Sequence, residues 1–128
     1  MDHKVKLVIE LPDKVLKEKE AAGVIIPARR GDITILSQRA PSVFVTDYGM
    51  IQLLDDTGKA VQKIFVTAGM ADMADGKLHL LTSRILESDE ISAEEALKRS
   101  LEADNESDKL FYQMIGDRLK NKRLSYRF

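Results

Sequence analysis

The chain changes its hydrophobic period near Ile91. Before this point, short β-type runs such as Val5–Ile9 and Ile64–Thr67 are separated by turns that contain Gly, Pro and Asp. From Ser92 to Lys122, apolar residues recur at helical spacing, with no proline and one glycine. This change of period predicts a β-rich module followed by a short helical hairpin.

Turn signals divide the first part of the chain into strands. Asp55–Lys59 and Asp75-Gly76 are strong hairpin signals, and Gly69 predicts a bend or a close contact between strands. Strands are expected near residues 4–10, 15–16, 23–27, 33–36, 42–48, 50–54, 61–67 and 77–83. Because no helical pattern lies between them, they predict an antiparallel sandwich or a flattened barrel.

The second part of the chain predicts two helices that pack antiparallel on each other. Ser92 and Glu95 have the spacing of a capping box, and Ser107 or Asp108 is expected to cap the second helix. The first helix has a narrow stripe of Ala93, Ala96, Leu97, Ser100 and Leu101. The second has a wider stripe of Leu110, Phe111, Met114, Ile115 and Leu119.

The charges of the hairpin are divided between its halves. Residues 87–106 are mainly acidic, whereas the later part carries Lys109, Arg118, Lys120, Lys122 and Arg123. One interpretation is a solvated hairpin whose halves attract each other. The other is a basic second helix that leaves and binds an acidic partner.

Composition favours a binding protein over an enzyme. The net charge is −1, there is no cysteine, and no apolar run is long enough for a membrane span. We expect a cytosolic protein, or one held at a membrane by a partner. His3 and His79 are the only histidines, and His79 is expected to be an outward-facing polar residue of a strand. No metal site, phosphate loop or cofactor motif is present.

A series of motifs resembles the epsilon subunit of rotary ATP synthases, which is called delta in mitochondria. The motifs are Pro12–Leu16, Val24–Pro27 with Gly31-Asp32, Leu36–Pro41, Phe65–Ala71 and Ile91–Ala96. The resemblance implies a sandwich of about ten strands over residues 1–88 and a two-helix hairpin over residues 89–128. It also implies a non-catalytic rotor subunit that couples the rotation of a proton-driven ring to ATP synthesis.

The resemblance implies partners and contact residues as well. The sandwich would bind the gamma subunit and the proteolipid ring, with Arg30, Gly31, Asp32 and Arg39 as ring-contact candidates. The hairpin would contact the catalytic alpha and beta subunits and inhibit ATP hydrolysis through Lys109, Arg118, Lys120, Lys122 and Arg123. The subunit would lie at the cytoplasmic face of a bacterial plasma membrane, in preference to a mitochondrial or chloroplast location.

The sequence departs from the family at the positions that bind ATP in many bacterial members. These positions are Ser92 and Glu95, and a carboxylate in place of a phosphate-binding cation should repel nucleotide. We therefore predict that the chain does not bind ATP. Two other hypotheses stay open: a free-standing sandwich whose basic tail binds an acidic protein, and a small hydrolase that uses His79 with a carboxylate.

Overall fold

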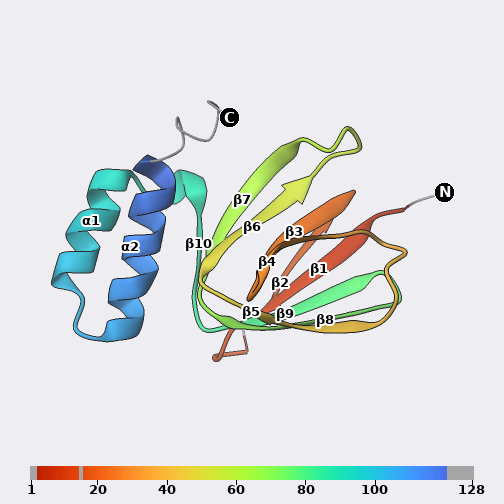
Figure 1. Cartoon of the computed structure of the whole chain (residues 1–128), viewed down its shortest axis with the longest axis horizontal. Coiled ribbons are helices and arrows are strands. Elements are labelled where there is room, and N and C mark those ends of the chain that lie inside the picture. The colour runs from red at the N-terminus through yellow and green to blue at the C-terminus, as the bar shows by residue number, and fades with distance from the viewer. Residues whose placement is uncertain (1–2, 15, 121–128) are drawn as a thin grey trace.

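The computed structural model describes residues 3–14 and 16–120. Figure 1 shows a two-layered β-sandwich with a helical hairpin at one end. The strands are β1 (Val5–Glu10), β2 (Leu16–Ala21), β3 (Gly23–Ala28), β4 (Gly31–Ile35), β5 (Ser42–Thr46), β6 (Gly49–Leu54), β7 (Ala60–Val66), β8 (Gly69–Ala74), β9 (Lys77–Thr82) and β10 (Ile85–Glu87). A 3-10 turn, η1 (Ser88–Glu90), leads to the helices α1 (Ala93–Glu102) and α2 (Glu106–Lys120). The predicted fold class is confirmed.

The sandwich is one sheet that bends back on itself. The strand order is β10-β7-β6-β3-β5-β8-β9-β1-β2, with β4 paired to β3. The bend lies where β3 meets β5, because these strands share only the pair Ala28 and Thr46. All pairings are antiparallel except that of β1 with β9, which is parallel. Lys19 of β2 reaches Glu87 of β10 across 3.9 Å, so the two ends of this order also come together.

The core between the layers is built from alternate residues of the strands. Leu7, Ile26, Ile51, Leu78 and Leu80 contribute to it, and each is at most 1% exposed. Alternation places the neighbours of these residues on the outer faces of the sandwich. Neither described helix has the length and apolar run needed to span a membrane.

The turns follow the predicted chemistry. Asp55 Oδ1 accepts hydrogen bonds from the amide nitrogens of Thr57 (2.9 Å) and Lys59 (3.0 Å) and from the Thr57 hydroxyl (2.6 Å). Gly69 is required where β8 meets β9, because a Cβ there would lie 1.9 Å from the carbonyl oxygen of Leu81. Both features were predicted as turn or close-contact positions.

The helix caps are partly as predicted. Ser92 Oγ accepts a hydrogen bond from the Glu95 amide at 3.1 Å, which confirms the start of α1. The Glu95 carboxylate pairs with Arg99 Nη2 of the same helix at 2.8 Å. This pair lies on the surface of α1. The predicted cap of α2 was wrong, because Asn105 Oδ1 accepts the Asp108 amide hydrogen at 2.8 Å.

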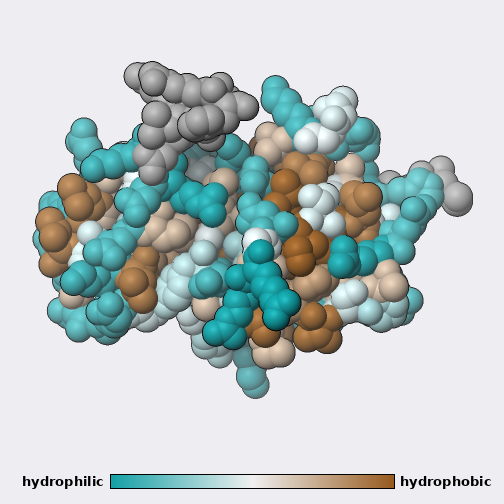
Figure 2. Space-filling model, in the orientation of Figure 1, coloured by the Kyte–Doolittle hydropathy of each residue, from teal (hydrophilic) through white to brown (hydrophobic). Residues whose placement is uncertain are grey.

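The apolar stripe of α1 is only half covered. Ala96 and Ser100 are buried against α2, whereas Leu97 and Leu101 are 50% and 78% exposed. Figure 2 shows hydrophobic side chains on the outer surface of this helix. The prediction of a single buried stripe was therefore wrong for the two leucines, because the small residues alone form the contact between the helices.

Two glycines should respond to alanine substitution with opposite signs. Gly69→Ala should destabilise the fold by about 1–3 kcal/mol or more, because its Cβ would collide with backbone atoms of Leu81. Gly116→Ala should stabilise the chain by up to about 1 kcal/mol, because its nearest neighbour would lie at 3.8 Å and alanine favours helices. Urea unfolding monitored by circular dichroism checks both signs, and equal midpoints would contradict the prediction.

The β6–β7 turn should weaken in acid. Hydrogen bonds from the Thr57 side chain and then from the Lys59 backbone lower the pKa of Asp55 below its usual value. A lowered folded-state pKa means that the stabilisation is present above the unfolded-state pKa and is lost as the pH falls through the folded-state pKa. An NMR titration should give a midpoint for Asp55 below that of aspartate in an unfolded peptide.

Candidate interaction surfaces

The outer face of the β5-β8-β9-β1-β2 layer carries a row of apolar side chains. Strand register places Val45 beside Met70, and Met70 beside Leu81. Leu81 pairs with Glu10, which in turn pairs with Leu16. Val45, Met70, Leu81 and Leu16 are 44–56% exposed, and Val43 on the same strand as Val45 is 69% exposed. We call these five apolar residues the apolar face.

A hollow of about 370 Å³ lies at one end of the apolar face. Its lining includes Leu81, Leu11, Pro12 and Ala68, together with Ser83 from the β9–β10 connection. An exposed apolar surface beside a hollow is typical of protein–protein contacts, where a buried anchor side chain contributes much of the binding energy. This arrangement suits a protein partner better than a small polar ligand.

His79 lies on this side of the sheet and has a carboxylate partner. Its Nε2 atom lies 2.9 Å from Glu10 Oε1, and both side chains are about one-third exposed. His79 therefore faces outward from its strand, as predicted, and is partly covered by its neighbours. Within the described residues, no group of three or more His, Cys, Asp or Glu side chains is placed to hold a metal. The pair is consistent with a hydrogen bond that orients two polar side chains within an apolar surface.

The predicted ring-contact residues lie at two opposite ends of the sandwich. Arg30, Gly31 and Asp32 are exposed at the β3–β4 turn, where Pro27 pairs with Asp32. Arg39 follows the far end of β4, across a strand of about 17 Å. Its guanidinium lies 5.1 Å from the centre of the Phe44 ring.

Arg39 shares its end of the sandwich with other basic residues. A shallow hollow there is lined by His3, Lys4, Lys6 and Arg39, together with Asp75. The structure therefore does not bring Arg39 together with the Gly31 turn. The two sets are separate surfaces.

The helical hairpin is docked on the sandwich through a second apolar cluster. Phe65 of β7 packs with Ile91, Ala96, Phe111 and Ile115, and all five are at most 7% exposed. Ile64 and Val66, on either side of Phe65, belong to the core between the layers. The last three residues of β7, 64–66, are consequently buried on both faces of the sheet, and the hairpin covers the face that carries Phe65.

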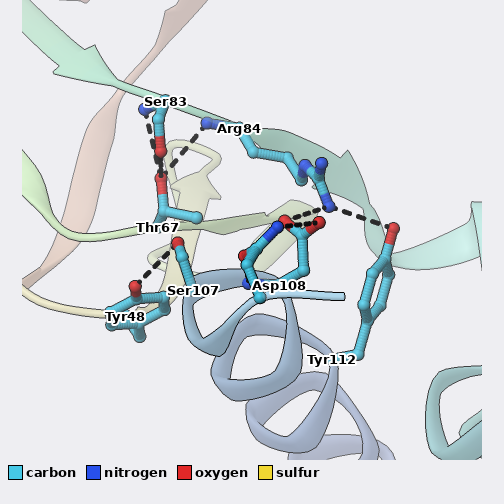
Figure 3. Close-up of polar contacts among 8 residues, drawn as sticks. Tyr48, Thr67, Ser83, Arg84, Ser107, Asp108 and Tyr112 are labelled. Atoms are coloured by element: carbon cyan, nitrogen blue, oxygen red, sulfur yellow. Dashed lines mark hydrogen bonds and ion pairs between the residues drawn. The ribbon is translucent and has the colours of Figure 1, made fainter. Parts of the chain in front are cut away.

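Polar contacts at the start of α2 complete the docking (Figure 3). Arg84 Nη1 lies 2.8 Å from Asp108 Oδ1 and 3.4 Å from the hydroxyl of Tyr112. The Arg84 guanidinium also lies 5.9 Å from the Phe111 ring centre. The hydroxyls of Tyr48 and Ser107 are 3.1 Å apart. Ser107 and Asp108, which were predicted as helix caps, therefore connect the helix to the sandwich.

Comparisons with known proteins agree on one family. The family model for the beta-sandwich domain of the ATP synthase delta/epsilon chain matches residues 4–88. The chain belongs to this family. An ATP synthase epsilon chain from Gluconacetobacter diazotrophicus is 30% identical over 105 residues, which cover 82% of this chain and 74% of that protein.

A mitochondrial relative and two solved structures extend the agreement. The mitochondrial ATP synthase subunit delta of Agaricus bisporus is 38% identical over 69 residues, covering 53% of this chain and 41% of that protein. A chain in the mitochondrial ATP synthase structure of Euglena gracilis matches 98% of this chain, over 83% of its own length, with a TM-score of 0.62 and 16% identity. A chain in the central stalk and c-ring structure of Tetrahymena thermophila matches 93% of this chain, over 95% of its own length, with a TM-score of 0.58 and 16% identity. At these identities the structural matches support the fold.

The family membership confirms the resemblance found in the sequence. The chain is an epsilon/delta-type, non-catalytic stalk subunit of an ATP synthase. The division at residues 88 and 89, the contact residues and the absence of ATP binding stay predictions. In the structure, Ser92 is occupied as a helix cap and Glu95 is paired with Arg99.

The basic residues of the epsilon-type hairpin are in part accessible in the docked state. Lys109, Arg118 and Lys120 are exposed on α2. Lys122 and Arg123 lie outside the described residues.

Sequence reasoning missed the apolar face and Arg84. The apolar residues on both sides of Phe44 were a signal for the apolar face, whereas no local pattern marks Arg84.

Proposed function

We propose that the chain is the rotor adaptor of a proton-translocating ATP synthase, which fixes the gamma subunit to the proteolipid ring. The observation that carries this role is the exposed apolar face on the sandwich of a chain that belongs to the ATP synthase delta/epsilon family. The gamma subunit would cover the apolar face and insert an apolar side chain into the hollow beside Leu81. Burial of five such side chains supplies binding energy without any chemical step.

The ring contact is proposed for the turn that contains Arg30, Gly31 and Asp32. Gly31 has φ = +129°, a backbone conformation that glycine adopts without strain, so the turn presents its two charged neighbours at the tip of a hairpin. Exposed charge pairs contribute only about 0.2–1 kcal/mol each, so this turn would set register more than affinity. Arg39, at the other end of β4, is not part of this contact.

The adaptor would lie at the cytoplasmic face of a bacterial plasma membrane, held there by the complex. Its epsilon-chain relatives in bacteria support this location over the mitochondrial one. The runner-up hypothesis is a free-standing interaction module. The apolar face fits this module equally well in chemistry, but the family membership favours the adaptor.

Charge on the apolar face should abolish binding to gamma and leave the fold intact. Met70→Asp should weaken binding to the gamma subunit of the same complex by at least about tenfold, because a desolvated carboxylate would face an apolar partner. Its effect on the free energy of unfolding should stay within about 0.5 kcal/mol, since the side chain is 52% exposed. Isothermal titration calorimetry and urea unfolding measure the two effects.

Val61→Asp is the matched control for this experiment. Val61 is 64% exposed but lies on β7, in the other layer of the sandwich. It should bind gamma like the unchanged chain. If Met70→Asp and Val61→Asp both bound normally, the apolar face would not be the gamma contact.

We also propose that the basic side chains of α2 restrain ATP hydrolysis by contacting an acidic segment of the catalytic subunits. Lys109, Arg118 and Lys120 lie on the exposed surface of the docked hairpin, clear of the Phe65 cluster. Changing all three to Glu should raise ATP hydrolysis by the assembled complex by about threefold or more, because each lost surface pair counts for about 0.2–1 kcal/mol. Lys98→Glu on α1 is the control, and unchanged hydrolysis in the triple variant would remove the regulatory role.

A further inference from the structure

The contact between the hairpin and the sandwich has two parts of different physical character. The Phe65 cluster is apolar, so its attraction does not depend on the position of a charge. The second part is Arg84, which connects the β9–β10 segment to Asp108 and Tyr112 of α2. Its ion pair is about one-third exposed, so salt can weaken it.

A buried threonine fixes the backbone that carries Arg84. Thr67 is 3% exposed, and its Oγ1 accepts hydrogen bonds from the amides of Ser83 and Arg84, each at 3.1 Å. The same hydroxyl is 2.7 Å from Thr82 Oγ1, and the Thr67 amide donates to the Arg84 carbonyl at 3.2 Å. Residue 84 is thus held by its carbonyl as well as by its amide, and Figure 3 shows the contact of the amide with Thr67.

We propose that Arg84, positioned by Thr67, is the electrostatic clamp that sets the fraction of molecules with a docked hairpin. The apolar cluster draws the hairpin to β7, and the clamp selects the docked orientation by pairing with the first turns of α2. Undocking must break the Arg84–Asp108 pair and leave Arg84 without its aromatic neighbours. The docked fraction is therefore sensitive to salt, and this sensitivity passes through one side chain.

Arg99 provides a matched comparison within the same protein. Its guanidinium lies 5.7 Å from the Tyr112 ring centre, close to the 5.8 Å of Arg84. Arg99 also makes an ion pair of 2.8 Å, with Glu95. All its partners belong to the hairpin, however, so these contacts survive undocking. The two arginines differ in whether their contacts cross from the sandwich to the hairpin.

Single-molecule fluorescence energy transfer can count docked and undocked molecules. The chain has no cysteine, so Asp56→Cys and Lys98→Cys introduce the only two labelling sites, on the exposed β6–β7 turn and on α1. Arg84→Met should raise the ratio of undocked to docked molecules about three- to tenfold, as expected for one charge-assisted contact that is partly exposed. Arg99→Met should leave this ratio unchanged.

Salt and the Thr67 variants test the mechanism of the clamp. Raising KCl from about 0.05 M to about 1 M should increase undocking in the unchanged chain but not in Arg84→Met, since salt screens the ion pair. Thr67→Val should promote undocking in the unchanged chain and add nothing in the Arg84→Met background. Thr67→Ser, which keeps the hydroxyl, should restore docking.

Equal effects of Arg84→Met and Arg99→Met would overturn the clamp, as would additive effects of Thr67→Val and Arg84→Met. This inference concerns the hairpin of the proposed rotor subunit, but its test uses the isolated chain. Its failure would leave the gamma and ring contacts untouched. Failure of gamma binding would likewise leave the clamp standing.

Discussion

Burial of the end of β7, residues 64–66, on both faces of the sheet is the constraint on which the arrangement depends. Ile64 and Val66 close the core of the sandwich, while Phe65 points to the other side and is 1% exposed. Complete burial of a large apolar side chain contributes about 1.5–3 kcal/mol, so an uncovered Phe65 would be costly. Phe111 and Ile115 of α2 provide the cover. The hairpin thus completes the outer surface of a strand that also forms the core.

The sequence predicted the features that depend on near neighbours. Asp55–Lys59 formed the expected hairpin turn, Gly69 marked a close strand contact, and Ser92 capped α1. Each of these depends on backbone conformation or on a hydrogen bond within a few residues, which composition and spacing reveal.

The features that the sequence did not reveal depend on distant neighbours or on a choice among similar residues. Residues 104–108, which span the start of α2, are all polar and could each accept an amide hydrogen, so spacing did not select Asn105. The Arg84–Asp108 pair joins the β9–β10 connection to the first turn of α2, and their approach is set by the docking of that helix. Leu97 and Leu101 have helical spacing, but the close contact of α1 with α2 through Ala96 and Ser100 leaves both leucines in solvent.

The two contact surfaces share one short segment of backbone. Leu81 lies on the apolar face, and Arg84, three residues later, holds the hairpin. Thr67 binds the segment between them through its hydroxyl and its carbonyl. The proposed role as a rotor adaptor would require the chain to transmit force without bending, and a segment fixed by several buried hydrogen bonds is stiffer than a free loop. A load applied to Leu81 by a bound partner would therefore be carried by the sandwich, and the same bonds would keep Arg84 aligned with α2.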